Sequence, residues 1–411
     1  MPQRMLLTFT MLLTAALAPA QPRATIRVLG QPNLTSGEVN HGGAVDAASH
    51  NYPLGIAVDP EGGIYVADRN NHRVLFFAND GNSVADRVYG QHGSFTAHIS
   101  NNDGDGNSGY PSAKNLSNPT GVALDSKGGI FVNDRDDHRI LHFAKGSTTA
   151  DRSYGQFGSF RVNMANNDGG GNYGEPSAGN IGTYTLGVVV DKDDGLYVSD
   201  ATNHRVLYFA NDGNTIADRV YGQWDDMTTG VRNNSGTGGI GAPSARSLNF
   251  PRGLAVDSFG GLYVADRDNN RVLYFAPDGD TSADRVYGQS GSFIVKADAN
   301  DGKGQPGAPT ADNLSHPKGV AVDAAGGIYI ADSLHHRILY YAAGNTTAER
   351  VWGQAGKFDT GVINNDGFGV SRATGPDNLN LPQNLWIDAT NLLYATDTGN
   401  SRTLVIDTKV R

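Results

Sequence analysis

The sequence predicts an all-β protein, a six-bladed β-propeller of four-stranded antiparallel blades, from three observations. An Asp-x4-Arg turn occurs six times, and its aspartates are separated by 66, 66, 66, 66 and 65 residues. Such a fixed period is the sign of a repeated structural unit. Glycine accounts for 54 of the 411 residues, as expected for a fold rich in turns. Short apolar runs bounded by turn residues recur within every unit, which is typical of strands.

Each unit is predicted to contain four strands, which in the first unit are residues 55–58, 64–67, 73–77 and 87–90. Their apolar residues are consecutive (GIAV, IYVA, VLFF) rather than alternating, so both faces of each sheet should be covered. A four-stranded sheet packed between copies of itself is a propeller blade. The units are approximately 53–118, 119–184, 185–250, 251–316, 317–381 and 382–411.

The two ends of the chain are predicted to build the last blade together. The sixth unit stops after its third strand, and its missing fourth strand has a counterpart near the N-terminus. There, residues 27–31 (RVLGQ) match the RVYGQ segment of the other units. We therefore expect residues 24–31 to complete the blade of 382–411, which closes the ring and removes an exposed sheet edge.

The repeated turn itself is interpreted as structural. A catalytic group is needed once, whereas this motif occurs in every blade, and its aspartate is expected to accept turn N–H groups and pair with the arginine. Histidine occupies the same turn in four units, but asparagine and serine replace it in the others (Asn270, Ser401), as suits a hydrogen-bonding role. The predicted pairs are Asp68–Arg73, Asp134–Arg139, Asp200–Arg205, Asp266–Arg271, Asp332–Arg337 and Asp397–Arg402.

Residues 1–20 are predicted to be a cleaved secretory signal peptide, leaving the propeller at 21–411. Arg4 precedes an apolar run of twelve residues, and Ala18-Pro19-Ala20 fits a signal peptidase site. The chain lacks cysteine, so a lipid-anchored lipoprotein is excluded and a secreted or periplasmic location is expected. No other run is long enough to span a bilayer. We therefore expect no membrane insertion. The protein is also expected to be a monomer.

The segment PLGIAVDPEGGIYVADRNNHRVLFF (53–77) resembles an NHL repeat, and related copies cover essentially the whole mature chain. The resemblance implies a propeller. Some secreted propellers similar to NHL proteins are lyases that hold a metal at the axis with several histidines. Here the residues that precede each first strand include one histidine, whereas catalytic zinc needs three protein ligands. These residues are Tyr52, Asn118, Tyr184, Phe250, His316 and Leu381.

Nucleic-acid binding, known for some NHL domains, is disfavoured by charge. The mature chain carries 31 basic and 42 acidic residues. Six long insertions between the blades carry a net charge of −6, whereas a nucleic-acid surface should be basic. These insertions are approximately 32–52, 92–118, 157–184, 224–250, 290–316 and 355–381.

Function is expected where the repeats differ, on the face that carries the insertions. The inner strands begin there, around the channel mouth, at Leu54, Thr120, Leu186, Arg252, Lys318 and Gln383. Basic residues on two adjacent blades face leucines on the opposite side, a polarity suited to a carboxylate or a small anion. The candidate ligand-binding residues are Arg252, Lys318, His316, Thr120 and Gln383.

A calcium site is a second candidate, in the first full insertion. Asn101, Asp103, Asp105 and Asn107 alternate like the first half of an EF-hand loop. Ser112 stands where the loop would need glutamate, and the other insertions do not preserve the pattern, so at most one site is expected. Apart from this calcium, no cofactor is predicted.

The sequence favours a non-catalytic binding or scaffold protein that recognises a protein, peptide or glycan. The alternative is a hydrolase or lyase with a metal or substrate site at the central channel. No catalytic residue is assigned, because the sequence has no recognisable nucleophile elbow, phosphate-binding loop or HExxH motif. A catalytic pair of carboxylates like that of glycosidases is neither predicted nor excluded, because the distance between two carboxylates cannot be read from the sequence.

Overall fold

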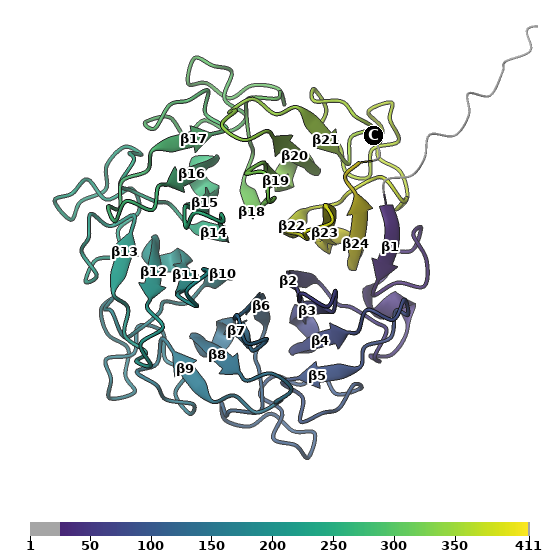
Figure 1. Cartoon of the computed structure of the whole chain (residues 1–411), viewed down its shortest axis with the longest axis vertical. Coiled ribbons are helices and arrows are strands. Elements are labelled where there is room, and N and C mark those ends of the chain that lie inside the picture. The colour runs from purple at the N-terminus through teal and green to yellow at the C-terminus, as the bar shows by residue number, and fades with distance from the viewer. Residues whose placement is uncertain (1–24, 410–411) are drawn as a thin grey trace, which may run out of the picture.

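A computed structural model describes residues 25–409 and confirms the predicted propeller. Six four-stranded antiparallel sheets surround a central axis, and Figure 1 shows them as six blades of a closed ring. The blades are numbered one to six from β2 onward. The predicted signal peptide, residues 1–20, lies outside the described residues.

The inner strand of each blade is its first strand. The inner strands are β2 (Pro53–Val58), β6 (Pro119–Leu124), β10 (Thr185–Val190), β14 (Pro251–Val256), β18 (Pro317–Val322) and β22 (Pro382–Ile387). The second strands are β3 (Ile64–Asp68), β7 (Ile130–Asp134), β11 (Leu196–Asp200), β15 (Leu262–Asp266), β19 (Ile328–Asp332) and β23 (Leu392–Asp397).

The third and outer strands complete each sheet. The third strands are β4 (Arg73–Phe77), β8 (Arg139–Phe143), β12 (Arg205–Phe209), β16 (Arg271–Phe275), β20 (Arg337–Tyr341) and β24 (Arg402–Asp407). The outer strands are β5 (Arg87–Tyr89), β9 (Arg152–Tyr154), β13 (Arg219–Tyr221), β17 (Arg285–Tyr287), β21 (Arg350–Trp352) and β1 (Thr25–Leu29). The first outer strand ends one residue earlier than predicted, because Gly90 takes a positive φ of 94°.

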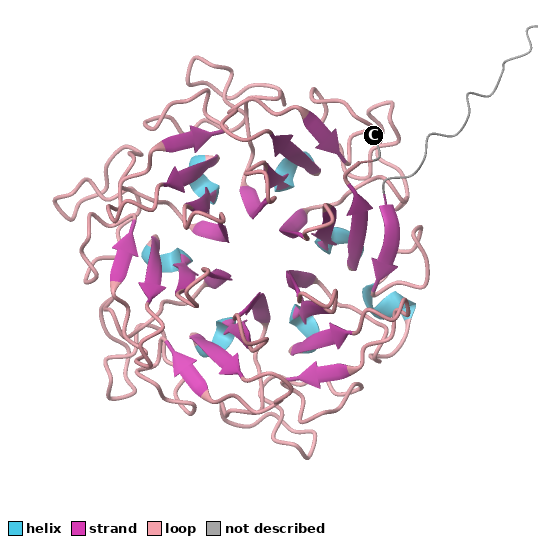
Figure 2. Ribbon diagram, viewed as in Figure 1, coloured by secondary structure: helices cyan, strands magenta, loops and turns pink. Residues whose placement is uncertain are grey.

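In the part of the chain that the structure describes, helical structure is limited to short 3₁₀ turns, which Figure 2 shows between the strands. They are η1 (Val39–Gly42), η2 (Arg69–Asn71), η3 (Arg135–Asp137), η4 (Ala201–Asn203), η5 (Arg267–Asn269), η6 (Ser333–His335) and η7 (Thr398–Asn400). Within residues 25–409, none of these helices has the length and apolar character needed to cross a membrane.

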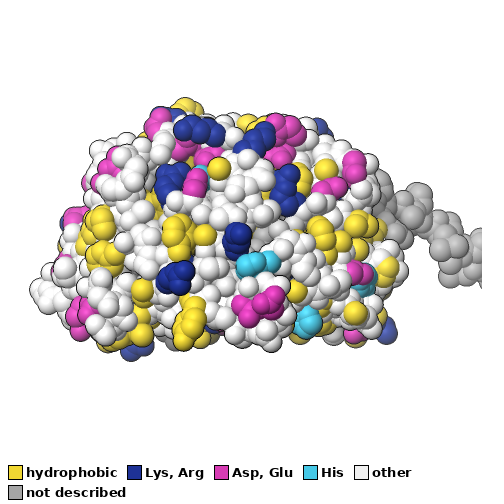
Figure 3. All heavy atoms as spheres, turned by 90° about the horizontal axis from the view of Figure 1, so that it is seen from below, with side chains coloured by type: hydrophobic (Ala, Val, Ile, Leu, Met, Phe, Trp, Pro, Cys, Tyr) yellow, Lys and Arg dark blue, Asp and Glu magenta, His cyan; other side chains and the backbone are white. Residues whose placement is uncertain are grey.

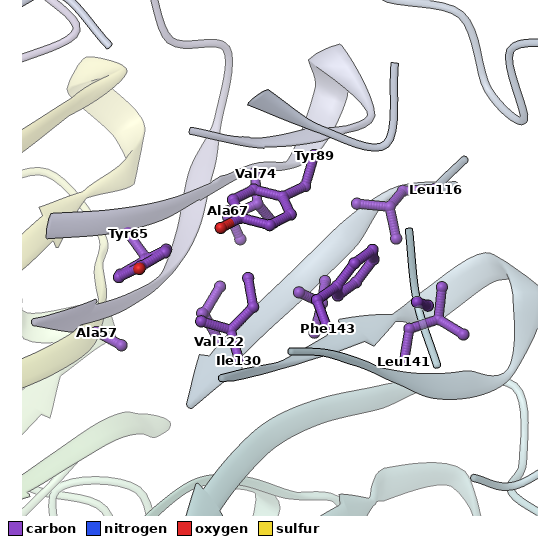
Figure 4. Packing of buried hydrophobic residues seen from close by; sticks show 12 residues of the cluster. Ala57, Tyr65, Ala67, Val74, Tyr89, Leu116, Val122, Ile130, Leu141 and Phe143 are labelled. Carbon is purple, nitrogen blue, oxygen red and sulfur yellow. The ribbon is translucent and has the colours of Figure 1, made fainter. Parts of the chain in front are cut away.

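The hydrophobic core lies between neighbouring blades, as the consecutive apolar residues predicted. Six clusters of buried residues are present among the described residues. Figure 4 shows the cluster in which Tyr65 and Tyr89 of blade one face Val122 and Phe143 of blade two. The rings of Tyr89 and Phe143 meet edge to face with centroids 5.4 Å apart, a favourable aromatic geometry.

The ring is closed by the N-terminal strand, as predicted. Strand β1 pairs with β24 in antiparallel register, and Leu29, opposite Thr403, is fully buried. The Gln31 amide donates to the Ser401 carbonyl at 2.9 Å. The Arg402 guanidinium donates to the Leu34 carbonyl at 2.7 Å. Blade six therefore depends on residues from both ends of the described chain.

Each Asp-x4-Arg turn forms a fully buried ion pair that also fixes the insertions. In all six blades the arginine Nε lies 2.6–2.8 Å from the aspartate Oδ2. In blade three the other nitrogens of Arg205 donate to the carbonyls of Ser177 and Asn180 in one insertion and of Met227 in the next. The arginines therefore hold the insertions down on the blades.

In blades one, three and five the histidine of the same turn links one blade to the next, whereas in blade two Nδ1 of His138 has no hydrogen-bond partner among the described residues. Nδ1 of His72, His204 and His336 accepts the backbone N–H of the residue before the next inner strand, at 3.1 Å each. In blade four the side-chain oxygen of Asn270 replaces the imidazole and accepts the N–H of His316 at 2.9 Å. Acceptance by Nδ1 requires a neutral ring.

Because of these histidines, we expect the folded protein to lose stability in acid. Burial lowers the pKa of His204 and of His336 to about 4, below the value of about 6.5 for an unfolded chain. Because the unfolded chain binds the proton more readily, this stabilisation is complete above pH 6.5 and is lost as the pH falls through about 4. Thermal melting from pH 7 to 4 should show a falling Tm, and His204→Asn should reduce the fall. His98→Asn, at an exposed histidine, is the control that should leave the fall unchanged.

Candidate anion-binding site at the channel mouth

The inner strands converge on a small pocket at the channel mouth, called the axial pocket below. Its volume is about 20 Å³, enough for roughly one water-sized group. The structure brings all six predicted strand-start residues together here. The lining residues are Leu54, Thr120, Leu186, Arg252, Gly253, Lys318, Gln383 and Asn384.

Glycines explain why these side chains crowd the axis. The residue after each strand-start position is glycine in blades one to five, and it lies against the neighbouring inner strand. A Cβ atom on Gly253 would stand 2.2 Å from the Lys318 carbonyl oxygen, so any larger residue would push the two strands apart. Close approach of the strands keeps the channel narrow and places Arg252 next to Lys318.

Arg252 spans the pocket from blade four to blade six. Its Nη1 donates to the side-chain oxygen of Gln383 at 3.1 Å, while its Nε is buried and has no hydrogen-bond partner among the described residues. Burial, reinforced by the nearby Arg267, lowers the pKa of Arg252 to about 10. The guanidinium stays charged at neutral pH and offers an unused donor.

Lys318 lies beside Arg252 in the intervening blade five. The side chain is half-buried, and residues 25–409 supply no hydrogen bond or ion pair to its amine. Burial first, and then repulsion from Arg252 and Arg267, lowers the lysine pKa to about 7. Its charge therefore changes in the neutral range.

The remaining candidate residues take different roles. Thr120 is buried, and its hydroxyl donates to the Thr185 carbonyl at 3.0 Å. His316 does not line the axial pocket. Its pKa is lowered mainly by burial, then by the charge of Arg267 and, to a smaller extent, by the charge of Lys318. Of the five candidates, Thr120, Arg252, Lys318 and Gln383 therefore line the pocket and His316 does not.

Three arginines around the mouth were missed by sequence reasoning. Arg69, Arg135 and Arg267 each follow the turn aspartate, where the other blades have Ala201, Ser333 and Thr398. They stack on aromatic rings that precede the inner strands: Tyr52 at 5.4 Å, Tyr184 at 4.4 Å and Phe250 at 5.5 Å from guanidinium carbon to ring centroid. Comparing that one position across the six units would have found them.

Acidic side chains balance part of this charge. Arg135 pairs with Asp136 at 3.1 Å and Arg267 with Asp268 at 2.8 Å, whereas Arg252 and Lys318 have no carboxylate partner among the described residues. On the side of the disc that Figure 3 shows, basic and acidic side chains are interspersed. Arg69, Arg252 and Lys318 are therefore the cations of this group that have no ion-pair partner among the described residues.

The predicted calcium residues form an exposed turn. Asp103 Oδ1 accepts the N–H groups of Asp105 and Asn107 at 2.9 and 3.1 Å, and these hydrogen bonds lower the pKa of Asp103. Asn101 is buried, and its amide donates to Asp137 at 3.0 Å. Among the described residues, no cluster of three His, Cys, Asp or Glu side chains is placed to hold a metal. Calcium binding at this turn stays a prediction.

Comparisons with known proteins agree with the fold. The family described as "NHL repeat" matches residues 51–77, 116–143, 248–275 and 314–341. A search of curated proteins finds no match.

Solved structures share the architecture at low identity. A structural genomics protein of unknown function from Bacteroides thetaiotaomicron VPI-5482 is 16% identical, with a TM-score of 0.52 over 89% of this chain and 72% of that one. An auxiliary nutrient binding protein from the same organism is 10% identical, with a TM-score of 0.51 over 87% and 70%. Virginiamycin B lyase from Staphylococcus aureus is 11% identical, with a TM-score of 0.47 over 88% and 97%. At identities this low the two Bacteroides structures show the fold alone, and the lyase, with a TM-score below 0.5, adds nothing to this.

Proposed function

Because this chain is an NHL-repeat β-propeller whose blades share one scaffold, we propose that it is an exported binding protein. It recognises a protein, peptide or glycan through the face that carries the channel mouth, and an anionic group of that partner enters the axial pocket. The observation that carries the proposal is the pair of cations, Arg252 and Lys318, which share the pocket without a carboxylate partner among the described residues.

The chemistry of the pocket suits a carboxylate. A carboxylate oxygen can accept from the buried Arg252 Nε and from the Lys318 ammonium, and charge-assisted hydrogen bonds of this kind are the stronger ones. Leu54 and Leu186 line the same pocket and provide the apolar wall that is usual in ligand sites. Binding would also relieve the repulsion between the two cations.

A metal-dependent hydrolase or lyase at the channel is the weaker alternative. A divalent cation on the axis would share the pocket with Arg252 and Lys318, and like charges repel. The same charges attract an anion.

The proposal is tested with acetate as the probe. In isothermal titration at pH 6, Arg252→Ala combined with Lys318→Glu should weaken acetate binding at least tenfold, because both donors are removed and a negative charge is added. Arg372→Ala with Lys192→Glu makes the same change of charge at exposed positions and should bind acetate normally. Equal affinity of the two double variants, both folded by circular dichroism, would contradict the proposal.

The affinity for acetate should also depend on pH. Lys318 is protonated below its pKa of about 7 and neutral above it, so acetate should bind most tightly near pH 6 and more weakly by pH 8. Titrations across this range measure the change. An affinity that is constant from pH 6 to 8 would show that Lys318 does not contribute its charge.

A further inference from the structure

The Lys318 amine has the surroundings of a nucleophilic lysine. It lies in a small pocket with apolar walls at Leu54 and Leu186 and beside the guanidinium of Arg252. Within the described residues, no carboxylate holds it as an ammonium ion. A lysine placed in apolar surroundings or next to another cation is activated as a nucleophile, because its neutral form is favoured.

We propose that Lys318 captures a small 2-oxo acid as a reversible imine, with Arg252 holding the carboxylate of the ligand. The proposal deepens the proposed function and rests on it, since the carboxylate enters the same anion-binding pocket. Arg252 provides the unused Nε donor for this carboxylate, and Gln383 fixes the guanidinium from the opposite side. The carbonyl carbon next to the carboxylate is thereby brought to the neighbouring amine.

The reaction balances without an oxidant or a cofactor. The lone pair of the neutral Lys318 Nζ attacks the carbonyl carbon and forms a C–N bond. Nζ then gives up both hydrogens, the carbonyl oxygen leaves with them as water, and a C=N bond remains. The pKa of about 7 supports this step, because about half of the amine is neutral at neutral pH.

The pocket favours the smallest members of the ligand class. Its volume of about 20 Å³ holds roughly one water-sized group, so a ligand that reaches Lys318 must be small and must extend out of the pocket. Glyoxylate, the smallest 2-oxo acid, is therefore the probe. Formaldehyde is the matched comparison, because it has the carbonyl carbon and lacks the carboxylate that Arg252 would hold.

The experiment traps the imine by reduction. The whole protein is incubated with glyoxylate and cyanoborohydride at pH 7, and the labelled lysines are identified by mass spectrometry of peptides. Lys318 should be labelled at least tenfold faster than Lys145 and Lys192, which are 67% and 64% exposed. Labelling of Lys318 no faster than of these two internal controls would overturn the proposal.

Two variants separate the roles of the amine and the guanidinium. Lys318→Arg should lose the label at this position. Arg252→Gln should lower the ratio of glyoxylate to formaldehyde labelling at Lys318 at least fivefold, because the carboxylate loses its donor. An unchanged ratio would overturn the role of Arg252.

Acetate binding by the unaltered protein separates this inference from the proposed function. If acetate binds but glyoxylate does not label Lys318 selectively, the imine is wrong and the anion-binding function stands. If the protein neither binds acetate nor is labelled selectively, both are wrong.

Discussion

Arg205→Leu should lower the free energy of unfolding by about 3–5 kcal/mol, the usual effect of removing one partner from a buried ion pair. The substitution leaves the Asp200 carboxylate buried and deprives it of its partner at 2.8 Å. It also removes hydrogen bonds to the carbonyls of Ser177, Asn180 and Met227. The substitution therefore breaks the ion pair and also detaches the two insertions that contain these carbonyls. Urea denaturation measures the change.

Lys192→Leu is the matched control in the same blade. Lys192 pairs with Asp193 on the surface, and both side chains are largely exposed, so the expected change is within about 1 kcal/mol. If Arg205→Leu were no more destabilising than Lys192→Leu, the turn pairs would not be structural, and a functional explanation of the repeated motif would be needed.

Deleting residues 24–34 should have an even larger effect. The deletion removes strand β1 and exposes the edge of β24, and it deprives Arg402 of the Leu34 carbonyl. Leu29, which is fully buried in the core between blades six and one, is lost as well. The Tm should fall by on the order of 10 °C, which corresponds to several kcal/mol in a chain of this size. Calorimetry of residues 21–411 with and without the segment makes the comparison.

Adding the missing strand back tests whether the fall comes from ring closure. A synthetic peptide of residues 24–34 should raise the Tm of the deleted protein with increasing peptide concentration, because it binds the folded state alone. A scrambled peptide should have no effect. A deleted protein that melts at the same temperature as the intact one would contradict the closure by β1.

The repeat predicted the architecture well because spacing and apolar runs are visible in one sequence. The six strand-start residues were grouped correctly, since equal register places Leu54, Arg252 and Lys318 at the same height on different blades. What the repeat could not show is how far a side chain reaches. Arg252 donates to Gln383 across an intervening blade, and no spacing rule indicates that contact.

The hydrogen bonds that attach the insertions to the blades could not be predicted from the sequence either. Long loops on one face suggested a place for function, but the partners of Arg205 in them are backbone carbonyls, which every residue type possesses. Likewise, the lowered pKa of Lys318 depends on burial and on neighbouring charges. These quantities arise only when the blades are packed together.

The axial pocket should bind an anion between Arg252 and Lys318. Anomalous scattering from crystals grown with bromide tests it most directly, because bromide is small and its position can be measured without a chemical assumption. A bromide peak is expected in the axial pocket within contact of the Arg252 guanidinium and the Lys318 amine, and it should be lost in Arg252→Ala with Lys318→Glu. A well-ordered pocket without bromide, in crystals that bind the ion elsewhere, would contradict it.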